Sequence, residues 1–430
     1  MKSTDFVERI RSNSLDPPVR SLMDIDFYKF TMGQLIYNRY RDVEVVLELI
    51  VRDKDIPVAE IVREDELRAA LDFVMGLSLT RTDIAYLRGM DVWGKNMFSE
   101  EYLTYLRMFR FPPYTLSRTG SSYRLRFRGR WGEVSMWETL ALAIISELYY
   151  RSLMRTMPKY EIDILYARAK DRIYSKLLKL KKYPGIRFAD FGQRRRHSFL
   201  WQEWVIGLCK DVMGSQFVGT SNTWMAFKHD LTPIGTNAHE LPMVLTALQD
   251  SDSRKKMAQY AVLNDWENLY GEGLRIMLPD TFGTEQFLAG AGEATARDWR
   301  GMRQDSGDPI SRGELYISWL GKHGVNPKEK NIIFSDGLDD DPMIWLYNHF
   351  RDHIQTSFGW GTLLTNDFRD CCDEPLFRPF SIVCKVVEAN GRPAVKLSDN
   401  LNKATGPKEE VERYQRIFGS VGQTQDRVLV

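Results

Sequence analysis

Short apolar runs recur in the second part of the chain, and each is followed by polar residues and a stretch with helical spacing. The runs lie within "IRFADFGQRRR" (186–196), "QFVGTSN" (216–222), "TPIGTNAHE" (232–240), "LRIMLPDTFGT" (274–284), "WRGMRQDSGDP" (299–309), "NIIFSDG" (331–337) and "IQTSFGWGT" (354–362). Seven strand–helix alternations predict a parallel sheet with crossover helices. That number favours closure into a barrel over an open sheet, and no GxGxxG motif follows any run. We therefore expect an α/β fold with an irregular TIM-like barrel.

The first part of the chain mixes helix and strand patterns. The spacing in "DFYKFTMGQLIYNRY" (26–40) predicts a helix, "VEVVLELIV" (43–51) predicts a strand, and "YTLSRTGSSYRLRFRGRW" (114–131) has the composition of a β-hairpin. A second hairpin pattern, around Asn390-Gly391, spans 380–399, and we expect it to rejoin the first domain or to cross the mouth of the barrel. These patterns predict an α+β domain over residues 1–140, completed by 375–430, and a barrel domain over 141–374.

The most apolar stretch of the chain is "WETLALAIISELYY" (137–150), which Glu138 and Glu147 interrupt. No apolar run reaches the length of about 18 residues that a membrane span requires. We interpret 137–150 as a buried helix of a soluble protein. The following stretch, "IDILYARAKDRIYSKLLKLKKY" (162–183), predicts a long amphipathic helix with a solvated basic face.

Length and charge narrow the class of protein. A chain of 430 residues with 43% hydrophobic residues is long enough for sizeable cores, in two domains or in one barrel with additions. Its net charge of +1 argues against a nucleic-acid or anionic-membrane binder, so any anion site must be local. The N-terminal "MKSTDFVERIRSN" lacks the apolar core of a signal peptide. Adjacent Cys371 and Cys372 fit neither a zinc knuckle nor a secreted disulfide framework, so we expect a cytoplasmic protein.

Polar side chains or a glycine turn follow nearly every apolar run of the predicted barrel. Because the carboxyl ends of barrel strands share one face, where active sites of this architecture lie, these residues should meet at one mouth. They are Arg194, Ser221, His239, Asp280, Arg303, Asp305, Asp336 and Gly359. One or two of them are expected to serve only as helix caps.

The predicted mouth combines three kinds of chemistry. Arginines 194, 195, 196 and 303 are suited to phosphate or carboxylate groups. Asp280, Asp305 and Asp336 are suited to sugar hydroxyls or to a Mg²⁺ that carries phosphate oxygens. The turn "SFGWGT" (357–362) offers backbone N–H groups to a phosphate, and Phe191 offers a flat face to an aromatic ring. Together they indicate a site for a phosphorylated ribose, a second anionic group and a planar ring.

Five short motifs carry a resemblance to a known family. The sequences "DFGQRRRHS", "FVGTSN", "GTNAHE", "RQDSGDP" and "FSDGLDD" resemble those of nicotinate phosphoribosyltransferases, of the type II phosphoribosyltransferases. The similarity extends from "DIDFYKFTMGQ" to "AVKLSD", nearly the whole chain. It implies the conversion of nicotinate and 5-phosphoribosyl 1-pyrophosphate to nicotinate mononucleotide and pyrophosphate in NAD salvage. It also implies coupling to ATP hydrolysis through a phosphorylated histidine, which here is His239.

The resemblance implies further roles by matching motif. His239, Asp280 and Arg303 would be catalytic, with Asp280 near the ring and the anomeric carbon. Phe191 would stack on the pyridine ring, and Tyr28 would cover its other face, across the interface of a homodimer or, in the alternative of a monomer, within its own chain. The remaining substrate contacts would be Arg194, Ser221, Asp305, Asp336, Gly359, Gly361, Lys385 and Lys396. Asp305 and Asp336 are the expected Mg²⁺ ligands, and no organic cofactor is implied.

Ser221 bears on the choice of substrate. Nicotinamide-using relatives have Asp where "GTSN" has Ser221, and an Asp would repel a carboxylate, whereas a hydroxyl donates to it. Nicotinate is therefore favoured over nicotinamide, the close alternative. A metal-dependent hydrolase that uses Asp280, Asp305 and Asp336 would need histidine ligands near those carboxylates, and only His239 lies at the end of a predicted strand. A non-catalytic nucleotide-binding protein is disfavoured because every motif position carries a reactive group. Glu240 either orients His239 or caps a helix.

Overall fold

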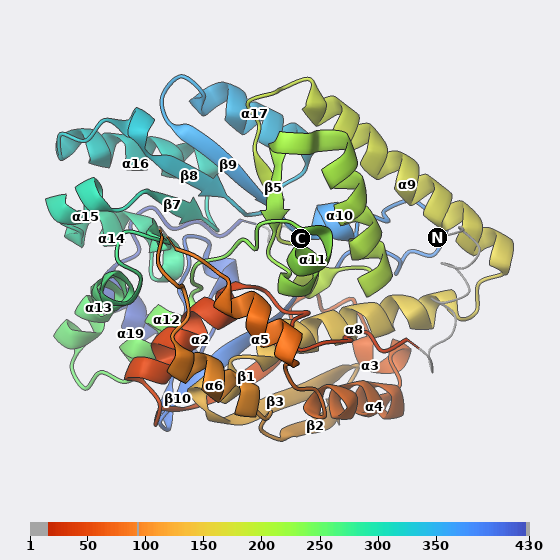
Figure 1. The fold of residues 1–430 in the computed structure, drawn as a ribbon. Coiled ribbons are helices and arrows are strands. Elements are labelled where there is room, and N and C mark those ends of the chain that lie inside the picture. Colours follow the sequence, from red (N-terminus) through yellow and green to blue (C-terminus); the bar gives the residue numbers. More distant parts are fainter. Residues whose placement is uncertain (1–15, 93, 427–430) are drawn as a thin grey trace.

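The structure is a computed structural model that describes residues 16–92 and 94–426. The N-terminal stretch that lacks the composition of a signal peptide lies outside these residues. One parallel and one antiparallel sheet organise the described chain, and helices flank both (Figure 1). None of the described helices combines the length and the apolar composition that crossing a membrane requires.

The parallel sheet is built from the middle of the chain, in the order β5-β4-β9-β8-β7-β6. Its strands are β4 (Phe188–Asp190), β5 (Phe217–Thr220), β6 (Ile276–Met277), β7 (Gly301–Gln304), β8 (Asn331–Phe334) and β9 (Gln355–Trp360). All neighbouring pairs in it are parallel, which confirms six of the seven predicted strands. The seventh run, 232–240, makes only one parallel bridge, from Pro233 to Thr220. The hydrogen bonds of this bridge use the Thr232 carbonyl and the Ile234 N–H, and the pairing with β5 does not extend beyond them. Closure of this sheet into a barrel stays a prediction.

Helices connect the parallel strands and lie along the sheet (Figure 1). They are α9 (Lys159–Lys181), α10 (Phe199–Met213), α11 (Thr223–His229), α12 (Glu240–Ala247), α13 (Asp252–Tyr270), α14 (Thr284–Gly290), α15 (Glu293–Asp298), α16 (Pro309–Lys322), α17 (Asp340–Phe350) and α18 (Thr362–Thr365). Short 3₁₀ turns are η1 (Gln193–Arg195), η2 (Gly214–Gln216), η3 (Pro279–Thr281) and η4 (Pro327–Glu329). The long helix predicted over 162–183 is α9.

The antiparallel sheet joins the two ends of the chain, in the order β11-β10-β1-β3-β2. Its strands are β1 (Glu44–Val51), β2 (Tyr114–Thr119), β3 (Ser122–Arg130), β10 (Ile382–Ala389) and β11 (Arg392–Pro393). The C-terminal strand β10 pairs with β1 from Val45–Ala389 to Val51–Ile382. Both predicted hairpins are confirmed, and the C-terminal one joins the N-terminal sheet. The proposed domain limits near 140 and 375 stay a prediction.

Further helices surround the antiparallel sheet (Figure 1). They are α2 (Tyr28–Arg39), α3 (Val58–Ile61), α4 (Glu64–Met75), α5 (Arg81–Arg88), α6 (Glu100–Met108), α7 (Trp131–Val134) and α8 (Trp137–Met154); η5 (Leu401–Lys403) and α19 (Lys408–Phe418) follow the last strand. Nearly all of α8 is buried, which confirms the buried helix predicted for 137–150. It contacts β10 of one sheet and η1 at the end of β4 in the other, so it bridges the two sheets.

Candidate active site

A cavity lies where the carboxyl ends of the parallel strands face the antiparallel sheet. The space between its walls is about 1300 Å³, a value that includes solvent at the open mouth. The cavity brings together eleven of the residues expected at the site: Tyr28, Phe191, Arg194, Ser221, His239, Arg303, Asp305, Asp336, Gly361, Lys385 and Lys396. Asp280 and Gly359 are not among its lining residues. They lie directly behind His239 and Phe191, respectively.

Positive charge dominates the cavity wall. Among the described residues, its cations are Arg52, Arg194, Arg195, Arg303, Lys385, Lys396 and Lys403, and its carboxylates are Asp26, Glu138, Asp305 and Asp336. Seven cations against four carboxylates favour a ligand with several negative charges. Because the chain as a whole is nearly neutral, any anion site was expected to be local, and this cavity is where positive charge is concentrated.

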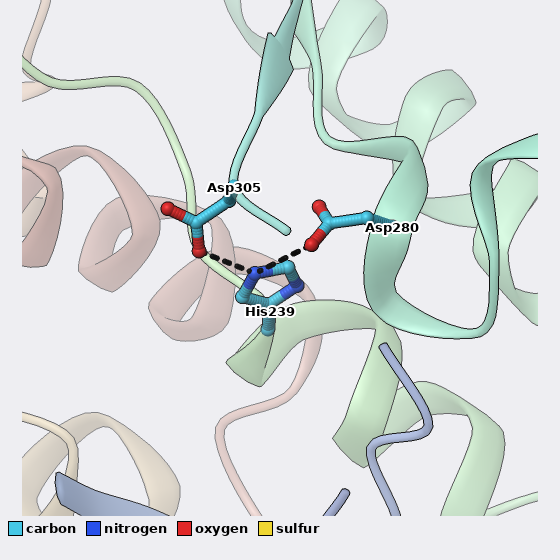
Figure 2. Close-up of side chains that lie close together, drawn as sticks. All are labelled: His239, Asp280 and Asp305. Carbon is cyan, nitrogen blue, oxygen red and sulfur yellow. Dashed lines mark hydrogen bonds and ion pairs between the residues drawn. The ribbon is translucent and has the colours of Figure 1, made fainter. Parts of the chain in front are cut away.

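His239 lies at the start of α12, and its Nε2 faces two carboxylates (Figure 2). Asp305 Oδ2, after β7, is 3.0 Å from Nε2, and Asp280 Oδ2, in η3, is 3.8 Å away. Lys396 Nζ lies 3.1 Å from the same nitrogen. On the other side of the ring, Nδ1 is 2.9 Å from Thr281 Oγ1. These contacts fix the orientation of the imidazole and place Nε2 among the charged groups of the site.

Burial sets the charge state of the imidazole. Burial and the nearby Lys396 ammonium lower the pKa of His239 to about 4, although Asp280 and Asp305 oppose the shift. Burial also lowers the pKa of Lys396 to about 8, again against the two carboxylates. At neutral pH the imidazole is therefore uncharged and has one nitrogen with a free electron pair. A neutral imidazole is a competent nucleophile.

The segment before His239 reaches this position because of a glycine. A Cβ on Gly235 would lie 2.8 Å from the backbone nitrogen of Tyr28, so no side chain fits where 232–240 passes the start of α2. Next to His239, the side chain of Glu240 turns away from the ring. Glu240 Oε2 accepts from Lys29 Nζ at 2.7 Å, and Oε1 accepts from Trp131 Nε1 at 2.6 Å. Glu240 therefore belongs to a buried network and does not orient His239.

Lys29 links that network to the cavity. Its Nζ also lies 2.7 Å from Glu138 Oε2, which accepts from the Tyr28 hydroxyl at 3.1 Å. Burial alone would raise the pKa of Glu138, but Lys29, Lys385 and Arg194 lower it, so Glu138 is ionised. Tyr28 thus lines the cavity of its own chain, held by Glu138, and does not have to come from a partner chain to do so.

Phe191 presents its half-buried ring to the cavity directly after β4. Its other side lies against β9, where a Cβ on Gly359 would come within 2.3 Å of two ring atoms. Gly359 sits inside the parallel ladder, paired with Ala189. Its visible function is to make room for the ring, whereas the phosphate role expected for it has no counterpart in this geometry. Gly361, two residues further along the chain, does line the cavity.

The three consecutive arginines after β4 have different environments. Arg194 lies 3.7 Å from Asp26 and 4.0 Å from Glu138, so its guanidinium is only loosely paired. Arg195 donates to the Ile382 carbonyl at 3.0 Å, and burial, Arg194 and Arg52 lower its pKa, so an incoming anion would stabilise its charge. Arg196 is fully buried and bonds both oxygens of Asp24 at 2.7 and 2.8 Å. Arg196 therefore serves the core and not the cavity.

Arg303 and Asp305 leave β7 toward the same mouth. Arg303 donates to the Asn237 carbonyl at 3.4 Å and lies 4.0 Å from Asp305. Asp305 Oδ1 accepts from the Ser335 hydroxyl at 2.9 Å. Burial would raise the pKa of Asp305, but Arg303, His239 and Lys396 hold it well below its usual value. Asp305 is therefore an ionised carboxylate beside the neutral imidazole.

Comparison with known proteins assigns the family. The model of the nicotinate phosphoribosyltransferase family matches residues 186–421, and that of its N-terminal domain matches 23–146. The chain belongs to the nicotinate phosphoribosyltransferase family. A nicotinate phosphoribosyltransferase from Porphyromonas gingivalis is 30% identical, with a TM-score of 0.82 over 93% of this chain and 100% of that one. One from Vibrio cholerae is 31% identical, with a TM-score of 0.83 over 95% of each chain.

In this family member, the carboxylates at the mouth already have cationic partners. Ligand atoms of His239, Asp280 and Asp305 lie within 4.8 Å of one another, a spacing that a metal ion could bridge. However, Lys396 Nζ stands 3.1 Å from His239 and 3.9 Å from Asp280, so an ammonium group lies where the cation would be. Asp336 accepts from Lys403. The geometry therefore does not fit a metal ion held directly by these side chains.

The phosphoribosyltransferase cavity contains four charged residues that sequence reasoning did not assign to it: Asp26, Arg52, Glu138 and Lys403. Glu138 had a signal, because a carboxylate inside a buried helix must be paired. Asp26 had a weaker one, since it lies two residues before the matched Tyr28. Arg52 and Lys403 had none, because they come from ordinary polar stretches that only the antiparallel sheet brings to the cavity.

Proposed function

We propose that this chain transfers the phosphoribosyl group of 5-phosphoribosyl 1-pyrophosphate to nicotinate, forming nicotinate mononucleotide and pyrophosphate for NAD salvage. The observation that carries the proposal is the combination of the half-buried Phe191 ring and seven cationic side chains in one cavity. The ring suits a flat pyridine, and the cations suit the phosphates and the carboxylate of the two substrates. The Porphyromonas and Vibrio proteins bear the name of this activity.

The reaction follows from the charges of the wall. As the bond from C1 of the ribose to pyrophosphate breaks, C1 becomes oxocarbenium-like and negative charge gathers on the leaving oxygens. Preorganised cations lower the free energy of that state, and Arg195, Arg52 and Lys403 are placed for this role. The ring nitrogen of nicotinate then forms the new bond to C1. Because that nitrogen carries no proton, no general base is required, and holding the partners in line supplies much of the rate.

Coupling to ATP is assigned to His239, as an extension of this proposal. Nε2 is nucleophilic in the tautomer that carries its proton on Nδ1, where it donates to Thr281. In that tautomer Nε2 accepts from Lys396 and no longer donates to Asp305. Nε2 attacks the γ-phosphorus, the bond to the ADP oxygen breaks, and the phosphoryl group moves to the ring. Lys396 lies 3.1 Å from Nε2, where it can neutralise phosphoryl oxygens. Water later cleaves the phosphohistidine, so the sum of the two steps is the hydrolysis of ATP to ADP and phosphate. The enzyme then resembles a ligase, because it couples formation of a new bond to ATP hydrolysis.

Mg²⁺ enters this proposal with the substrate and not as a resident ion. Asp305 and Asp336 are the carboxylates expected near it, but Lys403 already pairs with Asp336, and His239 and Ser335 contact Asp305. A Mg²⁺ bound to pyrophosphate oxygens would meet these carboxylates through its water ligands. The homodimer that the resemblance implies remains part of the proposal.

The test offers nicotinate or nicotinamide, with phosphoribosyl pyrophosphate and Mg²⁺, with and without ATP. We expect mononucleotide from nicotinate, and more of it with ATP. The His239→Ala protein should keep a basal rate but lose the stimulation by ATP and the incorporation of labelled γ-phosphate. Turnover of nicotinamide alone would overturn the choice of substrate. An unchanged response to ATP in His239→Ala would overturn the phosphohistidine.

A further inference from the structure

The carboxyl group that faces Ser221 changes the account of substrate choice. Asp26 immediately precedes Phe27 and α2, and an isolated bridge pairs it with Asn222 at the end of β5. The Ser221 hydroxyl donates to Asp26 Oδ1 at 2.5 Å, so its proton is already used. With Ser221 in place of the Asp of nicotinamide-using relatives, this end of the cavity was expected to contain no carboxylate. Asp26 instead supplies a buried carboxyl at the same place, from another element.

The second oxygen of Asp26 is open to the cavity. Within residues 16–92 and 94–426, no hydrogen-bond donor reaches Oδ2, and the nearest cation is Arg194 Nε at 3.7 Å. Phe191 follows Asp190, whose carbonyl accepts from the Ser221 backbone N–H at 2.7 Å, and Phe191 and Asp26 line the same cavity. A carboxylate on a pyridine that stacks on Phe191 would therefore approach both Arg194 and Asp26.

Four charged or titratable groups surround Asp26, namely Asp190, Glu138, Tyr28 and Arg194, and the first three are fully engaged. Asp190 accepts from Gly192, Gln202 and Thr220. Glu138 accepts from Lys29 and from the Tyr28 hydroxyl. Only Arg194 is loosely held. Burial raises the pKa of Asp26 to about 6, with Glu138 and Asp190 adding to the rise and Arg194 and Ser221 opposing it. A second carboxylate nearby would raise it further, because two such groups share one proton more readily than they bear two charges.

We propose that Asp26 is a specificity-determining residue, whose neutral carboxyl donates a hydrogen bond from Oδ2 to the carboxylate of nicotinate while Arg194 supplies the positive charge. Nicotinate then binds together with one proton from solvent, which is released when the product leaves. The ionised form of Asp26 repels nicotinate and instead accepts a hydrogen bond from an amide. This inference rests on the proposed function, because it assumes nicotinate at the Phe191 ring.

The test compares Asp26→Asn with the unchanged protein from about pH 6 to about pH 9, with saturating phosphoribosyl pyrophosphate and ATP. An Asn side chain donates at every pH. The ratio of kcat/KM for nicotinate, variant over unchanged protein, should therefore rise about tenfold per pH unit, to about 100-fold at two units above the pKa. Taking the ratio cancels titrations of substrates and of shared groups. A purely structural role for Asp26 would lower kcat/KM by the same factor at each pH and would overturn the inference.

Ser221→Ala supplies a second variant that keeps the carboxyl. Without the donor that stabilises the ionised form, the pKa of Asp26 rises, so the break in the pH profile should move to higher pH. A break that stays in place would contradict the inference even if Asp26→Asn fails to fold. An unchanged protein that leaves nicotinate unused at every pH would refute the proposed function itself. If the protein uses nicotinate but the ratio of kcat/KM between Asp26→Asn and the unchanged protein is the same at every pH, only the role of Asp26 is refuted.

Discussion

At the scale of single residues, the position of the Phe191 ring, on which the pyridine is proposed to stack, depends on the absence of a Cβ at Gly359. Gly359 has no Cβ, and Phe191 lies in the space that a Cβ would fill, with two ring atoms 2.3 Å from that position. Because Gly359 sits within a ladder of parallel strands, its backbone has little freedom to move away. A methyl group there must displace the ring.

We therefore expect Gly359→Ala to raise KM for nicotinate by about tenfold or more, since a ring displaced by about 1 Å loses most of a stacking contact. KM for phosphoribosyl pyrophosphate should change much less. Steady-state kinetics with each substrate varied in turn measures both values. Gly321→Ala is the matched control, because nothing lies within 4 Å of a Cβ at that position of α16. Equal changes in both KM values would contradict the assignment of Phe191 as the ring on which the pyridine stacks.

A second residue, His197, should limit stability in acid. It is fully buried, stacks on Phe368 with ring centroids 4.0 Å apart, and its Nε2 lies 2.7 Å from the Tyr166 hydroxyl. Burial lowers its pKa from the ordinary 6.5 to about 3. Between these values the unfolded chain binds the proton and the folded chain does not. The free energy of unfolding must therefore fall as pH drops through this window.

The slope that His197 contributes is at most about 1.4 kcal/mol per pH unit. Urea unfolding at several pH values from about 7 to about 4 should show a steeper decline for the unchanged protein than for His197→Gln. His239, with its own lowered pKa, adds a similar slope in both proteins and cancels in the difference. Parallel curves for the two proteins would show that His197 takes up its proton without unfolding.

At the scale of elements, one ammonium group joins three helices. Lys29 of α2 lies 2.7 Å from Glu138 of α8 and 2.7 Å from Glu240 of α12, and all three side chains are almost completely buried. Burial alone would raise the pKa of Glu138, and Lys29 is the largest of the charges that lower it. Removing one partner of a buried network leaves uncompensated charge in a medium of low dielectric constant, which is more costly than the pair itself is stabilising.

Lys29→Met should therefore lower the free energy of unfolding by roughly 3–5 kcal/mol. It should also reduce activity, because Glu138 holds Tyr28 and Glu240 adjoins His239. Arg88→Met is the control: it removes the bidentate but exposed contact with Glu100, and little change in stability is expected. Urea denaturation compares the two. A loss for Lys29→Met as small as that for Arg88→Met would contradict the role of the network.

Local sequence patterns were sufficient to predict most helices and strands, but they could not predict which side chains contact each other. Alternation and turn residues predicted both hairpins and six parallel strands, because those signals lie within a dozen residues. The run 232–240 has the same apolar start, but Pro233 and Gly235 adapt it to the start of α2 and not to a ladder. The partner of Glu138 is a lysine 109 positions away, and no local pattern contains that contact. For the same reason, Asp26 was not connected with Ser221.

At the scale of the whole molecule, the cavity needs both sheets and both ends of the chain. The part of the chain that builds the parallel sheet supplies Phe191, His239 and Asp305, whereas Lys385 comes from a C-terminal strand that is paired with β1. Tyr28 comes from the N-terminal helix of the same chain. One chain therefore contains every group that the proposed reaction uses, whether or not it forms the expected homodimer.

This arrangement predicts how two variants that each lack ATP-stimulated activity behave when mixed. If Tyr28 acted across a dimer interface, a mixed dimer of Tyr28→Ala and His239→Ala would contain one intact site, and up to about a quarter of the ATP-stimulated activity would return. If Tyr28 acts within its own chain, every site carries one defect. We expect no recovery after unfolding and refolding the variants together, with sedimentation confirming whether dimers form. Recovery in the mixture would show that the Tyr28 of a partner chain replaces the one beside Glu138, and that the homodimer is the catalytic unit.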